Sequence, residues 1–263
     1  MTVDAKTDVK KNDQLTFSMR EMILAVVIVI LLAIVSFDEL FDDDDEDDDG
    51  SGEAVIYKPQ VDPENFVDGI DNPYFPLTPG TTWTYEADTE DGKEVIVVVV
   101  TNQTKVIMGI NCTVVRDTVT IGGELFEDTY DWYAQDKDGN VWYMGEDSKE
   151  YEDGEVDPAG SWEAGVNGAQ PGIIMMAQPL PGFRYRQEYY KGEAEDMGEV
   201  LSLNETITVP WGTYNNCVMI RDINPFEPEV EEHKYYAEGI GVVGELTIRG
   251  GDERVELISM ETA

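Results

Sequence analysis

Residue types that usually carry catalysis are scarce in this sequence. It contains one histidine, His233, and two cysteines, Cys112 and Cys217. A Ser-His-Asp or Cys-His site would have to use His233, which lies in an alternating segment typical of a surface strand. A closed zinc site needs several Cys or His ligands, which so few residues do not supply. The GxSxG and GxxxxGKS/T motifs are absent, so the sequence offers neither a nucleophile elbow nor a P-loop.

A candidate calcium loop spans residues 136–147. Its start, DKDGN, offers side-chain oxygens at alternate positions, as an EF-hand loop does. The pattern then departs from that loop, because Val141 replaces the required glycine, an aspartate replaces the final glutamate and both flanks have strand character. The same letters suit a tight β-hairpin turn, which we expect here. No cofactor is predicted unless calcium binds the oxygen-bearing residues Asp136, Asp138, Asn140 and Asp147.

Paired carboxylates would suit a glycosidase, with one group as acid and the other as base or nucleophile. Residues 54–263 hold 41 acidic residues, so some pair lies at a suitable separation by chance alone. A carbohydrate-active enzyme is therefore an alternative, and we expect no catalytic residues. Such an enzyme would need a cleft with two carboxylates, one of them with a strongly raised pKa.

Residues 160–183, GSWEAGVNGAQPGIIMMAQPLPGF, carry few charges in a very acidic chain. A long apolar connection of this kind usually packs onto the core. The alternative is a lid or pocket lining, with adaptable methionines against an apolar ligand. The side chains that would then contact the ligand are Trp162, Ile173, Ile174, Met175 and Met176.

Strands must position these residues. One short sequence motif in the strand-like region occurs twice. Residues 111–117 read NCTVVRD and residues 216–222 read NCVMIRD, and glycines precede Asn102 and Asn204 by the same spacing. We interpret this as two β-meander repeats, at about 72–146 and 178–248, joined by an inter-repeat segment at 147–177. The predicted fold class is all-β: an antiparallel sandwich or curved barrel built from the tandem repeats and preceded by one transmembrane helix.

Composition supports these strands and raises a question about the cysteines. Runs such as EVIVVVVT are rich in β-branched residues, and helical periodicity is nearly absent after residue 54. If the repeats pack about a pseudo-two-fold axis, Cys112 and Cys217 would meet and form a disulfide. This bridge would close a loop of about a hundred residues and stabilise the fold by ~4.7 kcal/mol. Two buried free thiols are the alternative.

The amino-terminal region has the organisation of a membrane anchor. Residues 22–37, MILAVVIVILLAIVSF, are apolar and follow four basic residues, which places residues 1–21 in the cytoplasm and the rest outside. We expect an uncleaved transmembrane signal anchor at 22–37. A cleaved signal peptide is the alternative, although the small-residue pattern of a cleavage site is missing. Residues 38–53 are predicted to be an acidic disordered spacer, followed by an extracellular β domain at 54–263.

An extracellular location makes three sequons candidates for N-glycosylation. They begin at Asn102, Asn111 and Asn204, each followed two residues later by threonine. The alternative is that these residues are ordinary turn and strand residues without a glycan.

The formal net charge of −39 excludes one class of partner. A phosphate backbone would be repelled, and the sequence has no basic stripe, so nucleic acid is not expected. The acidity suits either a hydrated surface in salty surroundings or binding of multivalent cations. The membrane is the one predicted partner, through residues 22–37.

Three segments together resemble a group of exported bacterial and archaeal proteins of unassigned function. They are DWYAQDKDGNVWYMGEDSKEYEDG, GSWEAGVNGAQPGIIM and YRQEYYKGEAEDMGEV, and the resemblance covers roughly residues 72–245. It implies an exported, β-rich domain and carries no catalytic residues. We therefore predict a membrane-anchored surface protein with a non-catalytic structural or binding role. A carrier of an apolar small ligand and a carbohydrate-active enzyme are the alternatives.

Overall fold

The computed structural model describes residues 57–89, 91–152 and 154–262. Within these ranges lie one 3-10 helix, η1 (Pro63–Asn65), and 17 strands of one sheet. No helix among the described residues is long and apolar enough to cross a membrane. The cytoplasmic tail, signal anchor and acidic spacer predicted for residues 1–53 lie outside the described residues.

The long strands form two antiparallel runs that join in the middle of the sheet. The first run consists of β2 (Thr82–Thr89), β3 (Gly92–Ile107), β4 (Ile110–Ile121), β5 (Glu124–Asp136) and β6 (Val141–Asp147). The second run consists of β13 (Met197–Val209), β14 (Gly212–Ile223), β15 (Glu231–Ala237), β16 (Gly241–Arg249) and β17 (Arg254–Glu261). They join because β17 pairs with β2.

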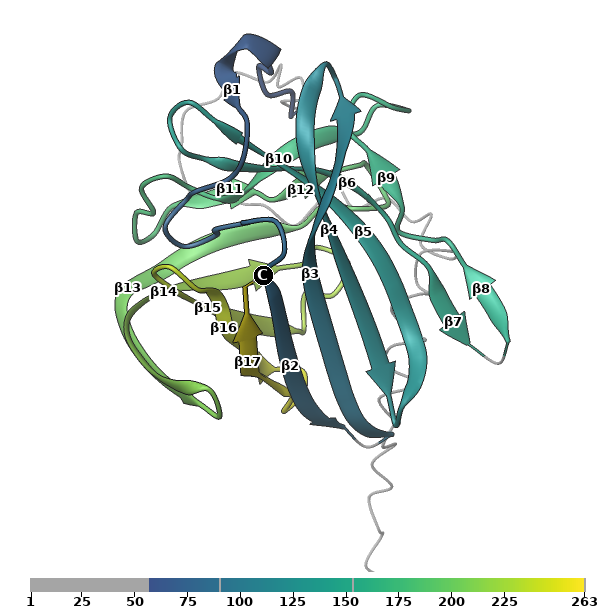
Figure 1. The fold of residues 1–263 in the computed structure, drawn as a ribbon, viewed down its shortest axis with the longest axis vertical. Helices are drawn as coiled ribbons and strands as arrows, with labels where there is room; N and C mark the ends of the chain where they lie inside the picture. Colours follow the sequence, from purple (N-terminus) through teal and green to yellow (C-terminus); the bar gives the residue numbers. More distant parts are fainter. Residues whose placement is uncertain (1–56, 90, 153, 263) are drawn as a thin grey trace, which may run out of the picture.

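Short strands bring the two outer edges of this sheet together. On one edge β10 (Gln170–Met175) pairs with β6, and on the other β11 (Arg184–Arg186) pairs with β13. β12 (Glu188–Tyr189) pairs with β10 and follows β11 after a single residue, so one stretch of chain contacts both edges. The sheet therefore curls into a nearly closed antiparallel barrel (Figure 1), which confirms the all-β prediction in its curved-barrel form.

The remaining strands pair along the margins of the first run. β1 (Phe66–Val67) and β7 (Glu150–Glu152) pair with β5, β8 (Glu155–Asp157) pairs with β7, and β9 (Trp162–Glu163) pairs with β6. In Figure 1, β7 and β8 project from the side of the barrel.

Closure of the barrel depends on a glycine. A Cβ atom at Gly172 in β10 would lie 2.3 Å from the carbonyl carbon of Gln187, the residue between β11 and β12. Real side chains do not approach a backbone so closely, so only glycine lets these two segments pair. The apolar stretch predicted to pack on the core or to line a pocket therefore forms part of the barrel wall.

Alternation along the strands produces two apolar cores. Val114 and Val115 are neighbours on β4, and because neighbouring strand residues point to opposite faces they enter different cores. The interior core includes Trp83, Val115 and Tyr236, and the outer core packs Trp132 and Trp162 on the other face of β4–β6. The residues 162–169 thus cover the outside of the first run.

The predicted disulfide between Cys112 and Cys217 is absent. Both cysteines are buried and free. Cys112 lies in the outer core, where its thiol donates to the Ile110 carbonyl over 3.6 Å, whereas Cys217 lies in the interior core. The prediction failed because it assumed a two-fold axis that would bring the two strands together, whereas the sheet places them in separate cores. The alternative of two buried thiols is the one observed.

Candidate ligand-binding cavity

A cavity of about 250 Å³ lies inside the barrel. Its wall is contributed by β2, β3, β4 and β5 of the first run, by β15, β16 and β17 of the second, by β10 and by the segment 75–77. Most of the lining is apolar and includes five aromatic residues: Phe75, Trp83, Tyr85, Tyr133 and Tyr236. The barrel interior is therefore hollow in a place where small barrels are usually filled by side chains.

The polar ends of two aromatic side chains are already occupied. Trp83 Nε1 donates to the Ile240 carbonyl over 2.9 Å, and the Tyr85 hydroxyl donates to the Val242 carbonyl over 3.0 Å. The two bonds fix both rings against the β15–β16 connection and leave their carbon surfaces to line the cavity.

Charged side chains enter the same interior from the second run. Lys234 lies opposite Glu245 across the β15–β16 pair. Its Nζ is 2.6 Å from Asp222 Oδ2 on β14 and 3.5 Å from Glu245 Oε1. Burial alone would lower the pKa of Lys234, but these two carboxylates reverse the effect and the pKa lies well above its usual value. Burial raises the pKa of Glu245 to about 8, although Lys234 acts in the opposite direction.

Two further carboxyl groups line the cavity from the first run. Asp131 on β5 accepts a hydrogen bond from the Tyr143 hydroxyl over 2.7 Å, and burial raises its pKa to about 7. The Oδ1 atom of Asp117 on β4 is buried and has no hydrogen-bond partner among the described residues. Burial, followed by the nearby charge of Asp131, raises the pKa of Asp117 well above its usual value. A buried acceptor without a donor is rare in folded proteins.

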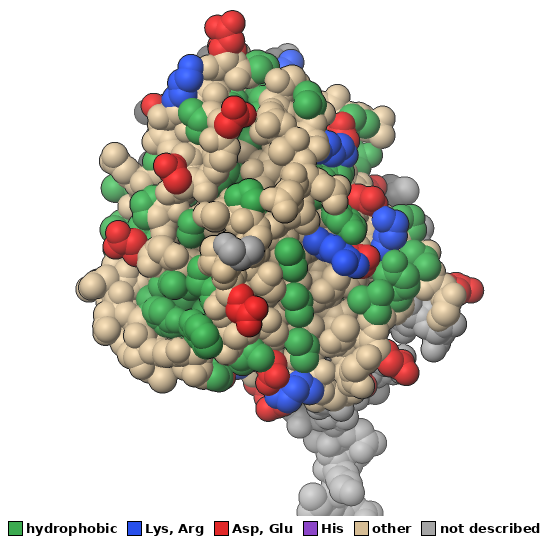
Figure 2. Space-filling view, in the orientation of Figure 1, with side chains coloured by type: hydrophobic (Ala, Val, Ile, Leu, Met, Phe, Trp, Pro, Cys, Tyr) green, Lys and Arg blue, Asp and Glu red, His purple; other side chains and the backbone are tan. Residues whose placement is uncertain are grey.

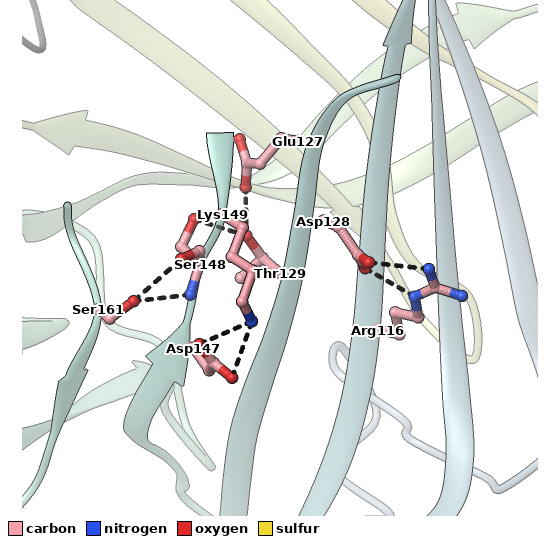
Figure 3. A network of polar contacts seen from close by, with 8 residues as sticks. All are labelled: Arg116, Glu127, Asp128, Thr129, Asp147, Ser148, Lys149 and Ser161. Carbon is pink, nitrogen blue, oxygen red and sulfur yellow. Dashed lines mark hydrogen bonds and ion pairs between the residues drawn. The ribbon is translucent and has the colours of Figure 1, made fainter. Parts of the chain in front are cut away.

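A polar network supports β5 beside the cavity (Figure 3). The Thr129 hydroxyl lies 2.5 Å from a Glu127 carboxylate oxygen and 2.8 Å from the Ser148 hydroxyl. The Ser148 amide donates to the Ser161 hydroxyl over 2.9 Å. Figure 3 also shows Arg116 and Asp128 in a bidentate ion pair, with N···O distances of 2.7 and 2.9 Å. Arg116 precedes Asp117 and points to the opposite face, so it does not neutralise the cavity carboxyl.

The residues predicted to bind an apolar ligand are separated in the structure. Ile174 lines the cavity, while Met175 and Met176 are buried in the interior core and Ile173 packs against it. Trp162 lies in the outer core, where its Nε1 donates to Glu188 Oε2 over 3.0 Å. The apolar segment therefore contributes one side chain to the cavity.

The four residues predicted for calcium are not brought together. Asp136 forms the expected hairpin turn instead: its Oδ1 accepts from the amides of Asp138 and Asn140, and its Oδ2 accepts from Asn140 Nδ2 and Trp142 Nε1. Asp147 lies at the far end of β6, where both carboxylate oxygens are 3.1 Å from Lys149 Nζ. Across the described residues no group of three or more His, Cys, Asp or Glu side chains is placed to hold a metal ion.

His233 and the three sequon asparagines are not among the residues that line the cavity. His233 is half-buried, with Nε2 3.0 Å from Glu231 Oε1. Asn102, Asn111 and Asn204 are exposed, so a glycan could be accommodated, and their modification stays a prediction. Residues 239–244 read GIGVVG, a GxGxxG spacing, but they form the turn after β15 and the start of β16, where Gly241 and Val242 line the cavity. Because no helix follows, they lack the helix N-terminus that a dinucleotide loop requires.

The sequence interpretation missed the lysine and the two aspartates of the cavity. A signal for them existed in the alternation of β15, EEHKYYA, which places Lys234 and Tyr236 on one face. The same alternation in β5 places Asp131 beside Tyr133. The acidic composition hid this signal, because single aspartates do not stand out in such a chain.

Acidic side chains are distributed differently on the surface and in the interior. Figure 2 shows single acidic side chains spread over one face, with hydrophobic side chains gathered toward its lower left. That view contains no dense acidic patch, whereas three carboxyl groups line one small cavity.

Comparisons with known proteins show similarity only at the level of solved structures. No protein-family model and no curated protein matches the chain. One similar structure is a protein from Bacteroides fragilis, provisionally described as exported and with a YmcC-like fold; it is 17% identical with a TM-score of 0.42, covering 72% of this chain and 99% of that one. Another is from Parabacteroides distasonis, provisionally described as a lipoprotein; it is 14% identical with a TM-score of 0.36, covering 74% of this chain and all of the other.

Proposed function

We propose that the barrel is an extracellular binding module that takes a small molecule into its interior cavity. The observation that carries this proposal is the hollow interior, whose mostly apolar wall carries three carboxyl groups and one lysine. Leaving a space of about 250 Å³ unfilled forgoes the packing contacts that side chains make in a filled barrel. A purely structural barrel would avoid this cost by filling its interior with side chains.

The binding module is proposed to stand on a membrane anchor. Residues 22–37 would cross the membrane once, with residues 1–21 in the cytoplasm and residues 38–53 as an acidic spacer. The apolar run and the basic residues before it support this arrangement. Glycans on the exposed asparagines would belong to the same extracellular face.

We also propose that the barrel arose by tandem duplication of a β meander. The two repeats start with similar contacts, before β2 and before β11: the Gly80 amide donates to the Val100 carbonyl and the Gly182 amide to the Val200 carbonyl, both over 2.8 Å. The strands that follow also pair in the same antiparallel order. These contacts support the repeats inferred from the twice-used sequence phrase.

An enzyme acting on a small saccharide is the second candidate. It is favoured by one observation, the placement of Asp117 and Asp131 with raised pKa values in one cavity. Binding without catalysis is preferred because the carboxyl groups lie inside the barrel, where a polysaccharide chain would not fit in 250 Å³. Release of sugar from glycosides by the purified protein would reverse this preference.

Native mass spectrometry of the full chain, purified in detergent from its own host, tests the binding function. Val98 lines the cavity, so Val98→Trp should fill it, whereas Val106 is 68% exposed and Val106→Trp should not. We expect a small-molecule mass on the wild-type protein and on the Val106 variant, and none on the Val98 variant. The absence of any retained mass, or equal retention by the folded Val98 variant, would reject the cavity as the binding site.

A further inference from the structure

One diagonal pair of side chains occurs at equivalent positions in both halves of the barrel, but its residue types differ between the halves. Lys234 and Asp222 are diagonal neighbours on β15 and β14, and Asp131 and Asp117 hold the same relation on β5 and β4. In the first case the pair is a lysine and an aspartate whose charged atoms are 2.6 Å apart. In the second case an aspartate stands where the lysine would be, so an acid faces an acid.

Lys234, in the second half of the barrel, does not supply the positive charge that the pair of Asp117 and Asp131 lacks. Lys234 Nζ is already within 2.6 Å of Asp222 and 3.5 Å of Glu245. Among the described residues that line the cavity, Lys234 is the only basic one, against the three carboxyl groups of Asp117, Asp131 and Glu245. The interior therefore lacks positive charge on the side of β4 and β5.

The lack of a partner is greatest at Asp117. Its Oδ1 atom is buried and has no hydrogen-bond partner in the part of the chain that the structure describes. Three aromatic donors of the barrel are already taken, because Trp83 and Tyr85 donate to backbone carbonyls and Tyr143 donates to Asp131. An unsatisfied buried acceptor destabilises a fold, and a donor that carries positive charge relieves it best.

The surroundings fit an organic cation better than a metal ion. Aromatic rings attract ammonium groups through the negative charge of their faces, and five aromatic residues line this cavity. A calcium or magnesium ion would instead need six or so oxygen ligands. The described residues contain no group of three or more acidic, His or Cys side chains placed to hold a metal.

We propose that the ligand of the cavity is a primary organic ammonium ion, whose N–H group donates to Asp117 and whose apolar body lies against the aromatic wall. The ammonium supplies beside Asp117 the positive charge that Lys234 supplies beside Asp222 in the other half of the barrel. This inference rests on the proposed binding function and names its ligand class.

A proton is the natural competitor of this ligand. Without a bound cation, the cavity carboxyl groups bind protons more readily than free ones, because burial raises the pKa values of Asp117 and Asp131 and the charge of Asp131 raises that of Asp117 further. The charges that face Asp117 from the packed strands are Asp131 and Glu127 on β5, Glu94 on β3 and Lys234 on β15. Binding of an ammonium ion therefore releases protons, and affinity rises as the pH increases through about 7.

Isothermal titration calorimetry of the full chain in detergent tests the ligand class. The probe is benzylammonium chloride, and benzyl alcohol is its uncharged counterpart of similar shape. We expect benzylammonium to bind at least tenfold more tightly than benzyl alcohol at pH 8, with a smaller ratio at pH 6. Asp117→Asn should reduce benzylammonium affinity at least tenfold and leave benzyl alcohol unchanged. The control Asp88→Asn removes a carboxylate that is 91% exposed and should change neither affinity by more than about twofold.

A second variant tests whether the ligand replaces a lysine. Asp131→Lys would restore the pair found in the other half, so it should abolish benzylammonium binding and keep the protein folded. Equal affinity of the wild-type protein for both probes, or unchanged benzylammonium affinity in Asp117→Asn, would overturn the ammonium proposal and leave the binding function intact. If neither probe binds and native mass spectrometry finds no retained mass, the binding function itself fails.

Discussion

Replacing Lys234 with methionine tests whether the interior charges are coupled as the structure indicates. The Nζ atom is 2.6 Å from Asp222 and 3.5 Å from Glu245, which corresponds to attractions of roughly 6 and roughly 5 kcal/mol at an effective dielectric constant of about 20. The cost of removing the charges from water offsets much of this attraction. Loss of one partner from a buried pair typically costs 3–5 kcal/mol. We therefore expect Lys234→Met to lower the free energy of unfolding by about 3–5 kcal/mol at pH 8.

The penalty should depend on pH, because the stranded Glu245 carboxyl group, whose pKa burial raises to about 8, can take up a proton. Its protonation costs about 1.4 kcal/mol for each pH unit above the pKa of the unfolded chain. At pH 5 this cost is small, so Lys234→Met should be less destabilising there than at pH 8.

Urea unfolding followed by tryptophan fluorescence measures both effects. Lys93→Met is a matched control, because Lys93 Nζ also lies 2.6 Å from a carboxylate, Glu86, but its side chain is 52% exposed. An exposed pair contributes about 0–1 kcal/mol, and Lys93→Met should lose no more than this. Equal losses in the two variants, or a Lys234→Met loss that does not grow between pH 5 and pH 8, would refute the reasoning.

Three other predictions follow from the same interior and its margins. Burial raises the pKa of Glu245 to about 8, so the folded protein binds more protons than the unfolded chain between about pH 4.5 and pH 8. The urea concentration at the midpoint of unfolding should therefore fall as the pH rises through that window. Cys112 and Cys217 should react with a thiol reagent only after unfolding, and a reductant should leave the mass of the intact chain unchanged. Asp136→Ala should lower the free energy of unfolding by about 1–3 kcal/mol, because four donors lose their acceptor, while exposed Asp138→Ala should change it by less than about 0.5 kcal/mol.

Local features of the fold could be predicted from the sequence. The β-branched runs around β3 and β4 and the DKDGN turn after β5 are specified by neighbouring residues, and each is found where it was expected. Such features depend on backbone preference and alternation over a few residues, which a single sequence records directly.

Features that depend on distant contacts could not be predicted in this way. Closure of the barrel requires Gly172 to meet the backbone of Gln187, and nothing around Gly172 in the sequence names that partner. The cysteine pairing failed for the same reason, because the similar phrases around Cys112 and Cys217 indicate similar local strands and leave their separation in space undetermined.

Some of the acidic residues lie in the barrel interior, which composition alone does not reveal. A hydrated acidic surface needs its carboxylates in water, yet Asp117 and Asp131 face a cavity in the barrel, where burial raises their pKa values. Apolar residues at these two positions would fill the interior and remove the desolvation cost, so stability alone does not account for the acids. Departures from good packing and paired charge are concentrated where proteins bind ligands. Asp117 has an oxygen without a hydrogen-bond partner among the described residues, whereas the equivalent Asp222 in the other half of the barrel is paired with Lys234, and this departure is the reason that we propose a binding role for the interior.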